Sequence, residues 1–421
     1  MKFLKDFSRR FFKSRLVISS LVMGTGAVVG GFINYLYHLL MGRMLGPADY
    51  GLLVSLISLF SLLIIPSSAI GLIIVKFVSF YKGKKEFAAI SILFKKIIKK
   101  LLPFSLLFLL IFLMISPIII SFLHLSSFLP LLIILITILI AIFSMVNKAF
   151  LQGLLRFGWL TASGILEVLI KLSVAVIFVM WGFKVNGALF GLVLGGIIAL
   201  LFTFLPLRSL LKIKKEDLKI NTKEILNFSV PAFLFTLSFT SLYTSDVILV
   251  RHFFSDQQTG FYAALSTLGK IIFFLAGPIV SVMFPMISER HANGGKYKNL
   301  LLLSLGLVGI ICLFAISFYF LLPSFIIRIF YGQQYLSVAP FLGFFAVFLS
   351  LYTLCFLFVS FFLSIHKTKV VILPVTATIL QIVFIYFFHQ TILTVVLISI
   401  YITALLLISL LLYLTQYKNE K

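Results

Sequence analysis

Long, unbroken runs of apolar residues dominate the chain, and short polar segments separate them. A helix that crosses a bilayer needs about 20 predominantly apolar residues, and each run is long enough. The alternation of period two that marks membrane β-strands is absent, so the runs predict helices rather than a barrel. We expect twelve transmembrane helices, at about 16–41, 51–75, 101–123, 128–150, 161–182, 186–207, 228–252, 260–286, 300–322, 338–363, 369–388 and 391–414.

A basic linker at 208–227 divides these helices into two lobes of six, at 16–207 and 228–414. The lobes repeat in sequence: MLGPADYGLLVSLISL (44–59) aligns with FFSDQQTGFYAALSTL (253–268), which places Gly51 on Gly260. An even number of spans in each lobe gives both the same orientation. We therefore expect an all-α polytopic membrane protein whose two pseudo-symmetric six-helix lobes surround a central cavity.

Composition excludes a soluble enzyme, because 62% of the residues are hydrophobic and only 11% are charged. Soluble domains carry about 25% charged residues. The net charge of +24 indicates basic cytoplasmic loops rather than nucleic-acid binding. With a basic cytoplasmic N-terminus (1–15) and a cytoplasmic tail (415–421), 29 of the 35 Lys and Arg residues fall on the cytoplasmic side. The sequence thus predicts a multi-pass plasma-membrane protein with both termini in the cytoplasm.

The segment 76–100 mixes basic and apolar residues at helical spacing. This pattern predicts a helix that lies along the inner membrane surface and contacts membrane lipids. A solvated charge run is the alternative, but Phe87, Ile90 and Phe94 would then lack cover.

Four ionisable side chains fall inside predicted spans, where they face the bundle interior or water by default. Glu167 and Lys171 lie four residues apart, hence on one helix face where they can pair. Asp246 and Lys270 fall on successive spans joined by a short outer loop, so they can face each other. Each pair is either a structural ion pair or part of a polar pathway. In a pathway, Lys270 and Lys171 would suit an anionic cargo, and Asp246 or Glu167 would suit ion coupling.

Two other kinds of residue are candidates for a transport role. Arg43 is an outer cation near the end of a span, where it either snorkels to the interface or contacts cargo. Pro66 and Pro278 fall at nearly corresponding places in the two lobes. Each frees a backbone carbonyl, so they are candidate hinges, although a static kink has the same sequence pattern.

No pattern in the chain predicts an enzyme. There is no Walker A sequence, the six histidines are scattered, and Cys312 and Cys355 lie in separate apolar runs without metal-ligand spacing. We expect no catalytic residue, no metal and no cofactor.

Several stretches resemble one family when their order and spacing are considered together. They are LLMGRMLGPADYGLLVSLISLFSLL (39–63), AFLQGLLRFGWLTASGILEVLIKLSVAVIFV (149–179), SDVILVRHFFSDQQTGFYAALSTLGK (245–270), FYGQQYLSVAPFLGFFAVF (330–348) and LSIHKTKVV (363–371). They resemble the Wzx-type polysaccharide-biosynthesis, or oligosaccharide flippase, proteins of the multidrug/oligosaccharidyl-lipid/polysaccharide exporter superfamily. The resemblance implies two six-helix lobes and a glycan on a polyprenyl pyrophosphate, moved from the inner to the outer leaflet.

The leading hypothesis is therefore a lipid-linked oligosaccharide flippase that works by alternating access and meets membrane lipids and glycan-assembly proteins. A cation-coupled multidrug exporter of the same superfamily is the first alternative, and Lys270 argues against it. A membrane glycan polymerase or ligase is the second, although the short outer loops and the missing acid/base cluster argue against an enzyme. A non-transporting scaffold is the third, in which the buried charges would be purely structural.

Overall fold

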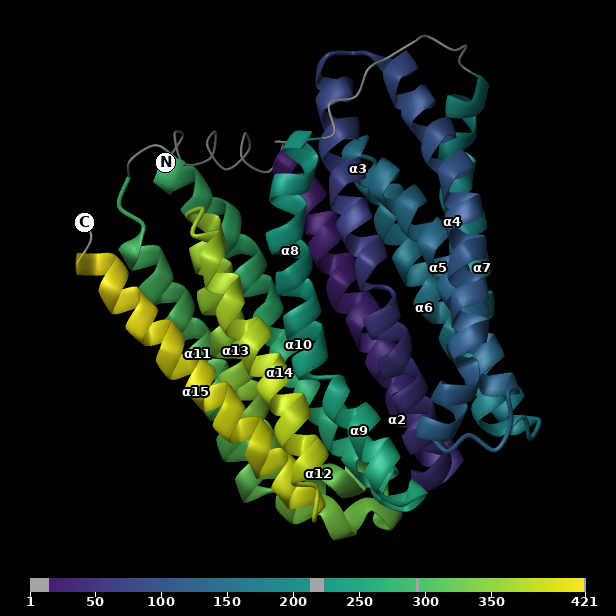
Figure 1. Ribbon diagram of the computed structural model, residues 1–421, viewed down its shortest axis with the longest axis vertical. Coiled ribbons are helices and arrows are strands. Elements are labelled where there is room, and N and C mark those ends of the chain that lie inside the picture. Colours follow the sequence, from purple (N-terminus) through teal and green to yellow (C-terminus); the bar gives the residue numbers. More distant parts are fainter. Residues whose placement is uncertain (1–14, 213–222, 293–294, 420–421) are drawn as a thin grey trace, which may run out of the picture. The chain divides into compact units, whose positions relative to one another are not determined.

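The computed structural model describes residues 15–212, 223–292 and 295–419, and every regular element within them is a helix (Figure 1). This confirms the predicted all-α polytopic membrane fold. Almost all of the predicted N-terminus (1–15), residues 213–222 of the predicted linker and the last two residues of the tail lie outside the described residues.

The first compact unit contains the chain up to Leu40 together with Pro66–Ser229. Its central helix is α5, which packs against α4, α6 and α7 and is the most deeply buried of them. Its elements are the first part of α2 (Arg15–Leu63), then α3 (Ile65–Gly83), α4 (Phe87–Phe122), α5 (Leu129–Gly153), α6 (Phe157–Met180), α7 (Lys184–Phe204), the 3-10 helix η1 (Leu205–Lys212) and the start of α8 (Lys223–Leu242).

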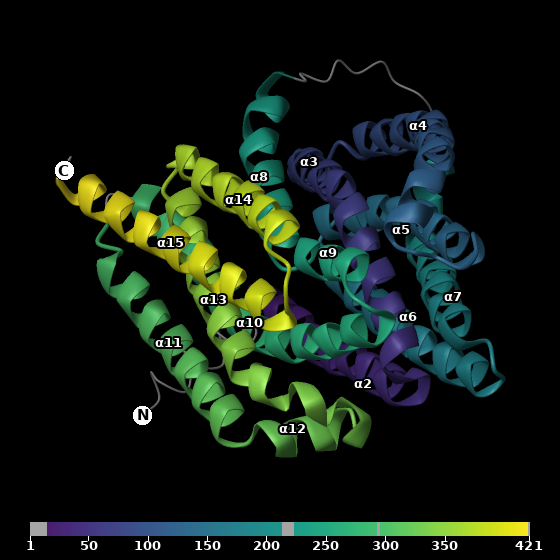
Figure 2. The same cartoon turned by 60° about the horizontal axis from the view of Figure 1, so that its bottom comes forward.

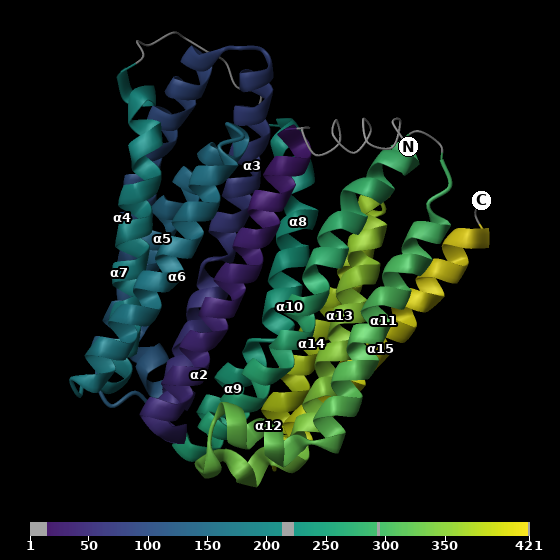
Figure 3. The ribbon, with the colours of Figure 1, turned by 180° about the vertical axis from the view of Figure 1, so that it is seen from behind.

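The second compact unit contains Met41–Ile65 and Val230–Lys421. Here α13 is central and packs against α10, α11 and α15 (Figures 2 and 3). Besides α8, its elements are α9 (Ser245–Phe253), α10 (Asp256–Ala292), α11 (Lys298–Leu321), α12 (Pro323–Phe330), η2 (Gln333–Phe341), α13 (Leu342–Ser364), η3 (Thr368–Val371), α14 (Ile372–Phe387) and α15 (Ile392–Asn419).

One segment departs from the predicted division of the chain. The repeat assigns residues 41–65 to the first lobe, but in the structure this part of α2 packs with the second unit. The helix is interrupted at Gly46, whose φ of 76° is accessible to glycine at no steric cost. Helix α2 belongs to the first unit up to Leu40 and to the second from Met41, and the break at Gly46 lies just beyond this boundary.

The described residues contain ten helices long and apolar enough to cross a membrane, or eleven if the bent pair α8–α9 is one span. With the bent pair counted as one span, the remaining difference from twelve lies in the first two predicted spans. The candidate span Val22–Ser67 has 46 residues, about twice the 20 that a single crossing needs. Its break at Gly46 makes room for two crossings, which is consistent with about twelve helices.

The structure divides the basic segment 76–100 between two helices. Residues 76–83 form the end of α3, and residues 87–100 form the first turns of the 36-residue helix α4. Apolar residues on both sides of the basic run allow each helix to continue through it. Ile90 and Phe94 are shielded from water by the first unit itself, because both side chains are buried there.

Candidate functional site

Lys171 on α6 lies at the centre of a polar cluster in the first unit. Its side chain is 7% exposed. Its ammonium group donates a hydrogen bond to Oδ1 of Asn34 and lies 4.3 Å from the centroid of the Tyr37 ring. Tyr37 in turn donates to the carbonyl of Ala188 on α7, at 3.1 Å. The buried charge is therefore held by one acceptor and by the electron-rich face of an aromatic ring.

Glu167 pairs with a different lysine from the one expected. Its carboxylate accepts a bond from Lys148 on α5 at 2.5 Å, and Lys148 comes from the neighbouring helix rather than from α6. Both side chains are about one-third exposed. Spacing of four residues placed Glu167 and Lys171 on one face, but their direct partners come from α5 and α2.

Close packing of α7 fixes the position of this cluster. Gly191 and Gly195 lie against α6, and an added Cβ would stand 2.4 Å from the carbonyl oxygen of Lys171 and 2.6 Å from that of Glu167. Only glycine permits so close an approach of the two helices. The glycines of α7 therefore fix where α6 holds Lys171 and Glu167.

Asp246 is the central residue of the polar cluster in the second unit. It is fully buried. Oδ2 accepts a hydrogen bond from the Tyr262 hydroxyl at 2.7 Å, and Oδ1 accepts one from the backbone N–H of Val247 at 2.8 Å. Asp246 lies in the first turn of α9, directly after the bend that separates α9 from α8. The bend therefore places a carboxylate at a helix N-terminus, where the helix dipole favours negative charge.

Lys270 on α10 lies near this carboxylate, as the sequence predicts. The two charges interact electrostatically, but no direct ion pair joins them in the described part of the chain. The Lys270 ammonium lies 5.0 Å from the centroid of the Tyr243 ring. Its side chain is only partly buried, and among the described residues it makes no hydrogen bond. Lys270 thus has donors that remain available, whereas Lys171 is bonded to Asn34.

The Asp246 cluster continues through further polar groups in the unit. The Tyr262 hydroxyl lies near Ser399, which accepts a hydrogen bond from Nε2 of Gln381 at 2.8 Å. Oε1 of Gln381 is buried and has no hydrogen-bond partner among the described residues. Buried polar atoms are nearly always paired. This network therefore contains an acceptor that is open to a proton donor or a cation.

Arg43 contributes to helix capping in the second unit. Its guanidinium donates to the carbonyls of Phe330, at 3.0 Å, and Ile329, at the C-terminal end of α12. These are terminal carbonyls that lack a partner within the helix. The remaining guanidinium N–H groups are exposed with the side chain.

The two candidate hinge prolines occupy different local structures. Pro66 lies in the first turn of α3, directly after the break at Ile64. Pro278 lies inside the long helix α10. Proline is accommodated without loss of a hydrogen bond only at the first of these positions.

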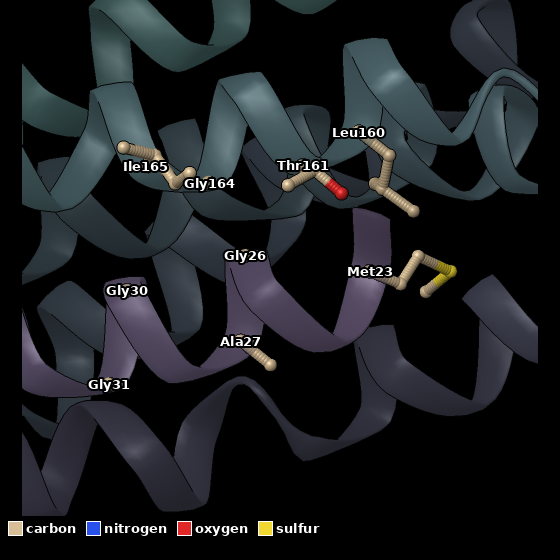
Figure 4. Close-up of a pocket in the computed structure, with 9 residues that line it drawn as sticks. All are labelled: Met23, Gly26, Ala27, Gly30, Gly31, Leu160, Thr161, Gly164 and Ile165. Atoms are coloured by element: carbon tan, nitrogen blue, oxygen red, sulfur yellow. The ribbon is translucent and has the colours of Figure 1, made fainter. Parts of the chain in front are cut away.

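A shallow groove of about 330 Å³ lies between α2 and α6 in the first unit (Figure 4). Its lining is almost wholly apolar: Met23, Gly26, Ala27, Gly30, Gly31, Leu160, Thr161, Gly164 and Ile165. Thr161 contributes a hydroxyl, and Figure 4 shows it opposite Gly26. This groove lacks the charged groups of the two clusters.

The sequence did not indicate the aromatic partners of the charged groups. Tyr37, Tyr243 and Tyr262 look like ordinary span residues in a chain with 15 tyrosines. Tyr37 follows Asn34 by three residues on α2, so the two lie on the same helix face, and Tyr243 precedes Asp246 by three across the break between α8 and α9. That spacing was the one available signal.

The described residues contain no group of three or more His, Cys, Asp or Glu side chains that could hold a metal ion. Both cysteines are buried and free.

A model of the family described as polysaccharide biosynthesis protein matches residues 16–291, well over half of the chain. The chain belongs to the polysaccharide biosynthesis protein family. The match includes both polar clusters except for Ser399 and Gln381. A search of curated proteins finds no match.

Solved structures of MOP superfamily transporters share the fold of this family member. An inward-facing multidrug resistance MATE family transporter has a TM-score of 0.74 and 18% identity, over 93% of this chain and 99% of the other. The lipid II flippase MurJ in an inward closed conformation has a TM-score of 0.73 and 16% identity, over 95% and 87%. A MOP superfamily transporter from Pyrococcus furiosus, described as having a binding pocket of reverse polarity, has a TM-score of 0.63 and 18% identity, over 95% and 96%. At these identities the likeness establishes the fold.

Proposed function

We propose that this protein moves a polyprenyl-pyrophosphate-linked oligosaccharide from the inner to the outer leaflet of the plasma membrane by alternating access. Membership of the polysaccharide biosynthesis family supports a glycan cargo, and a fold shared with MOP transporters supports transport. Both termini would lie in the cytoplasm, where glycan-assembly proteins would deliver the cargo.

The available ammonium group of Lys270 is the observation that carries the proposal. A pyrophosphate offers several acceptor oxygens, and its attraction to an ammonium group is stronger in a low-dielectric site than in water. Lys270 is partly exposed and hydrogen-bonded to no described residue. Lys171 and Arg43 already donate hydrogen bonds, to Asn34 and to the end of α12, so each has fewer donors left for the cargo.

We assign Asp246 to ion coupling in the same cycle. A proton or sodium ion on this buried carboxylate would remove its attraction for Lys270 and so change how firmly Lys270 is held. The unpaired Gln381 oxygen in the connected network offers a further ligand for such an ion. Glu167 already has a full charge partner in Lys148, so it is the weaker candidate.

The experiment is complementation of a deletion strain, with lipid-linked oligosaccharide and surface glycan measured together. Lys270→Arg keeps the charge and should restore surface glycan, whereas Lys270→Met keeps the bulk and should leave lipid-linked glycan to accumulate. Lys171→Met is the matched control for loss of a buried lysine. Normal glycan in the deletion strain would overturn the proposal, and efflux assays would then test the multidrug alternative.

Asp246→Asn tests coupling in proteoliposomes that contain labelled lipid-linked oligosaccharide. Transport by the wild type should rise with an imposed proton or sodium gradient, and transport by the variant should not respond. A variant with the wild-type response would exclude Asp246 as the coupling residue.

A further inference from the structure

One face of α4 is basic at its first turns and apolar along the rest of its length. Lys96, Lys99 and Lys100 are exposed on it. Farther along, Met114 and Ile118 are 81% and 68% exposed. At 100° per residue, Lys96 and Met114 project in the same direction, as do Lys100 and Ile118. The lysines therefore continue the apolar face rather than lying on another side of the helix.

The length of the apolar part matches a membrane. Exposed apolar residues run from Leu102 to Ile118, about 25 Å of helix at 1.5 Å per residue. The hydrocarbon core is about 30 Å thick. When this face meets the lipid chains, Lys96, Lys99 and Lys100 stand at the level of the phospholipid headgroups.

The opposite side of the same turns is anchored to the first unit. Ser91 donates a hydrogen bond to the carbonyl of Leu210 in η1. The ring of Phe94 packs edge-to-face on Phe150 of α5, with centroids 4.9 Å apart. These contacts fix the rotation of α4 and leave the three lysines on its exposed side.

The segment around these lysines carries a large excess of positive charge. Residues 76–100 contain eight lysines and one acid, Glu86, which lies in the turn between α3 and α4 rather than beside the three lysines. Clusters of basic residues next to a membrane span attract anionic lipid headgroups. A lysine stem can lie along the lipid chains while its ammonium group reaches the phosphate.

We propose that Lys96, Lys99 and Lys100 form a docking site for the phosphate headgroups of anionic phospholipids, whose acyl chains lie along the apolar face of α4. This site is distinct from the buried clusters around Lys171 and Asp246, and it does not depend on the cargo. Bound lipids would hold the first unit at a fixed depth in the bilayer.

The test compares two double variants of the full-length protein that lose the same charge. Lys96→Gln/Lys100→Gln removes lysines from the lipid face, and Lys84→Gln/Lys85→Gln removes two exposed lysines from the turn between α3 and α4. Native mass spectrometry of the detergent-solubilised protein would measure binding of phosphatidylglycerol against phosphatidylcholine. Because each basic residue near an anionic surface contributes a several-fold preference, the first variant should lose about tenfold or more. The second should change little.

The other outcomes overturn the proposal. Equal losses in both variants would mean a general charge effect without a site, and no loss in the first would mean that the lysines contact no headgroup. Displacement of phosphatidylglycerol by millimolar inorganic phosphate would indicate a site for the free anion. If the three lysines bind a polyprenyl pyrophosphate but not phosphatidylglycerol, the site serves the cargo. Lys96→Arg/Lys100→Arg should retain binding, since it keeps both charges.

Discussion

At the scale of single residues, the two lysines inside the spans differ in how their charges are held. Lys171 has a hydrogen-bond acceptor in Asn34 and an aromatic ring beneath it, whereas Lys270 has a ring and a nearby carboxylate. A buried charge without partners is costly, and removing one partner leaves the other uncompensated. The partners of these lysines therefore affect stability as strongly as the lysines themselves.

Replacing Asn34 with leucine should destabilise the protein by about 1–3 kcal/mol, since the Lys171 ammonium would lose its acceptor. Lys171→Met in the same chain should recover part of that loss, because the unpaired charge is then gone. Thermal unfolding in detergent measures both. Losses that simply add in the double variant would show that Asn34 and Lys171 do not interact.

The hydroxyl of Tyr262 allows a second test at this scale. Tyr262→Phe should destabilise the protein by about 1.5–3 kcal/mol, the range for a hydrogen bond to a charged group. In an Asp246→Asn background the effect should shrink toward about 1 kcal/mol, because the acceptor is then neutral. Chemical unfolding of the four proteins checks it, and an unchanged effect would mean that Asp246 carries no charge here.

At the scale of helices, backbone contacts decide which elements can lie together. Gly260 of α10 meets Pro47 of α2, and Gly51 of α2 meets Gly260 in return. Nearby, Tyr50 bonds with Thr267 at 3.0 Å and with Tyr331 at 3.1 Å. These contacts hold the second part of α2 in the second unit.

Gly260→Ala should therefore destabilise the protein by at least about 1–3 kcal/mol, since its Cβ would stand 1.8 Å from the Pro47 carbonyl oxygen. Gly30→Ala is the control, because an added Cβ there meets nothing within 4 Å. Alanine should be neutral or stabilising by about 0.5–1 kcal/mol at that helical position. Melting temperatures compare the two, and equal effects would mean that the α2–α10 contact is not close in solution.

At the scale of the whole molecule, the uneven distribution of charge predicts the orientation of the protein in the membrane. Most of the 35 basic residues fall at one end of the predicted spans, and basic loops stay in the cytoplasm. Since Cys312 and Cys355 are buried, they can be replaced by alanine to give a background for labelling.

In intact cells, a membrane-impermeant maleimide should label Lys184→Cys and Arg328→Cys. It should label Lys84→Cys and Lys369→Cys only after the membrane is opened. All four positions are exposed, so access depends on the side of the membrane. The reverse pattern would contradict the predicted cytoplasmic termini.

Sequence alone determined the all-helical membrane fold and the positions of the ionisable residues within its spans. These properties are local, because an apolar run long enough to cross a bilayer must form a helix and an ionisable residue inside it must be shielded from lipid. The proximity of Asp246 and Lys270 also followed, because a short loop joins their helices. The family resemblance rested on the same short stretches.

Tertiary structure alone decided the partners of those charges. Asn34 and Lys171 are separated by 137 residues, so no spacing along the chain could pair them. Glu167 takes Lys148 rather than Lys171, because the packing of α5, α6 and α7 decides which groups come within reach. The same is true of residues 41–65, whose place in the second unit depends on a backbone contact between two glycines distant in the sequence.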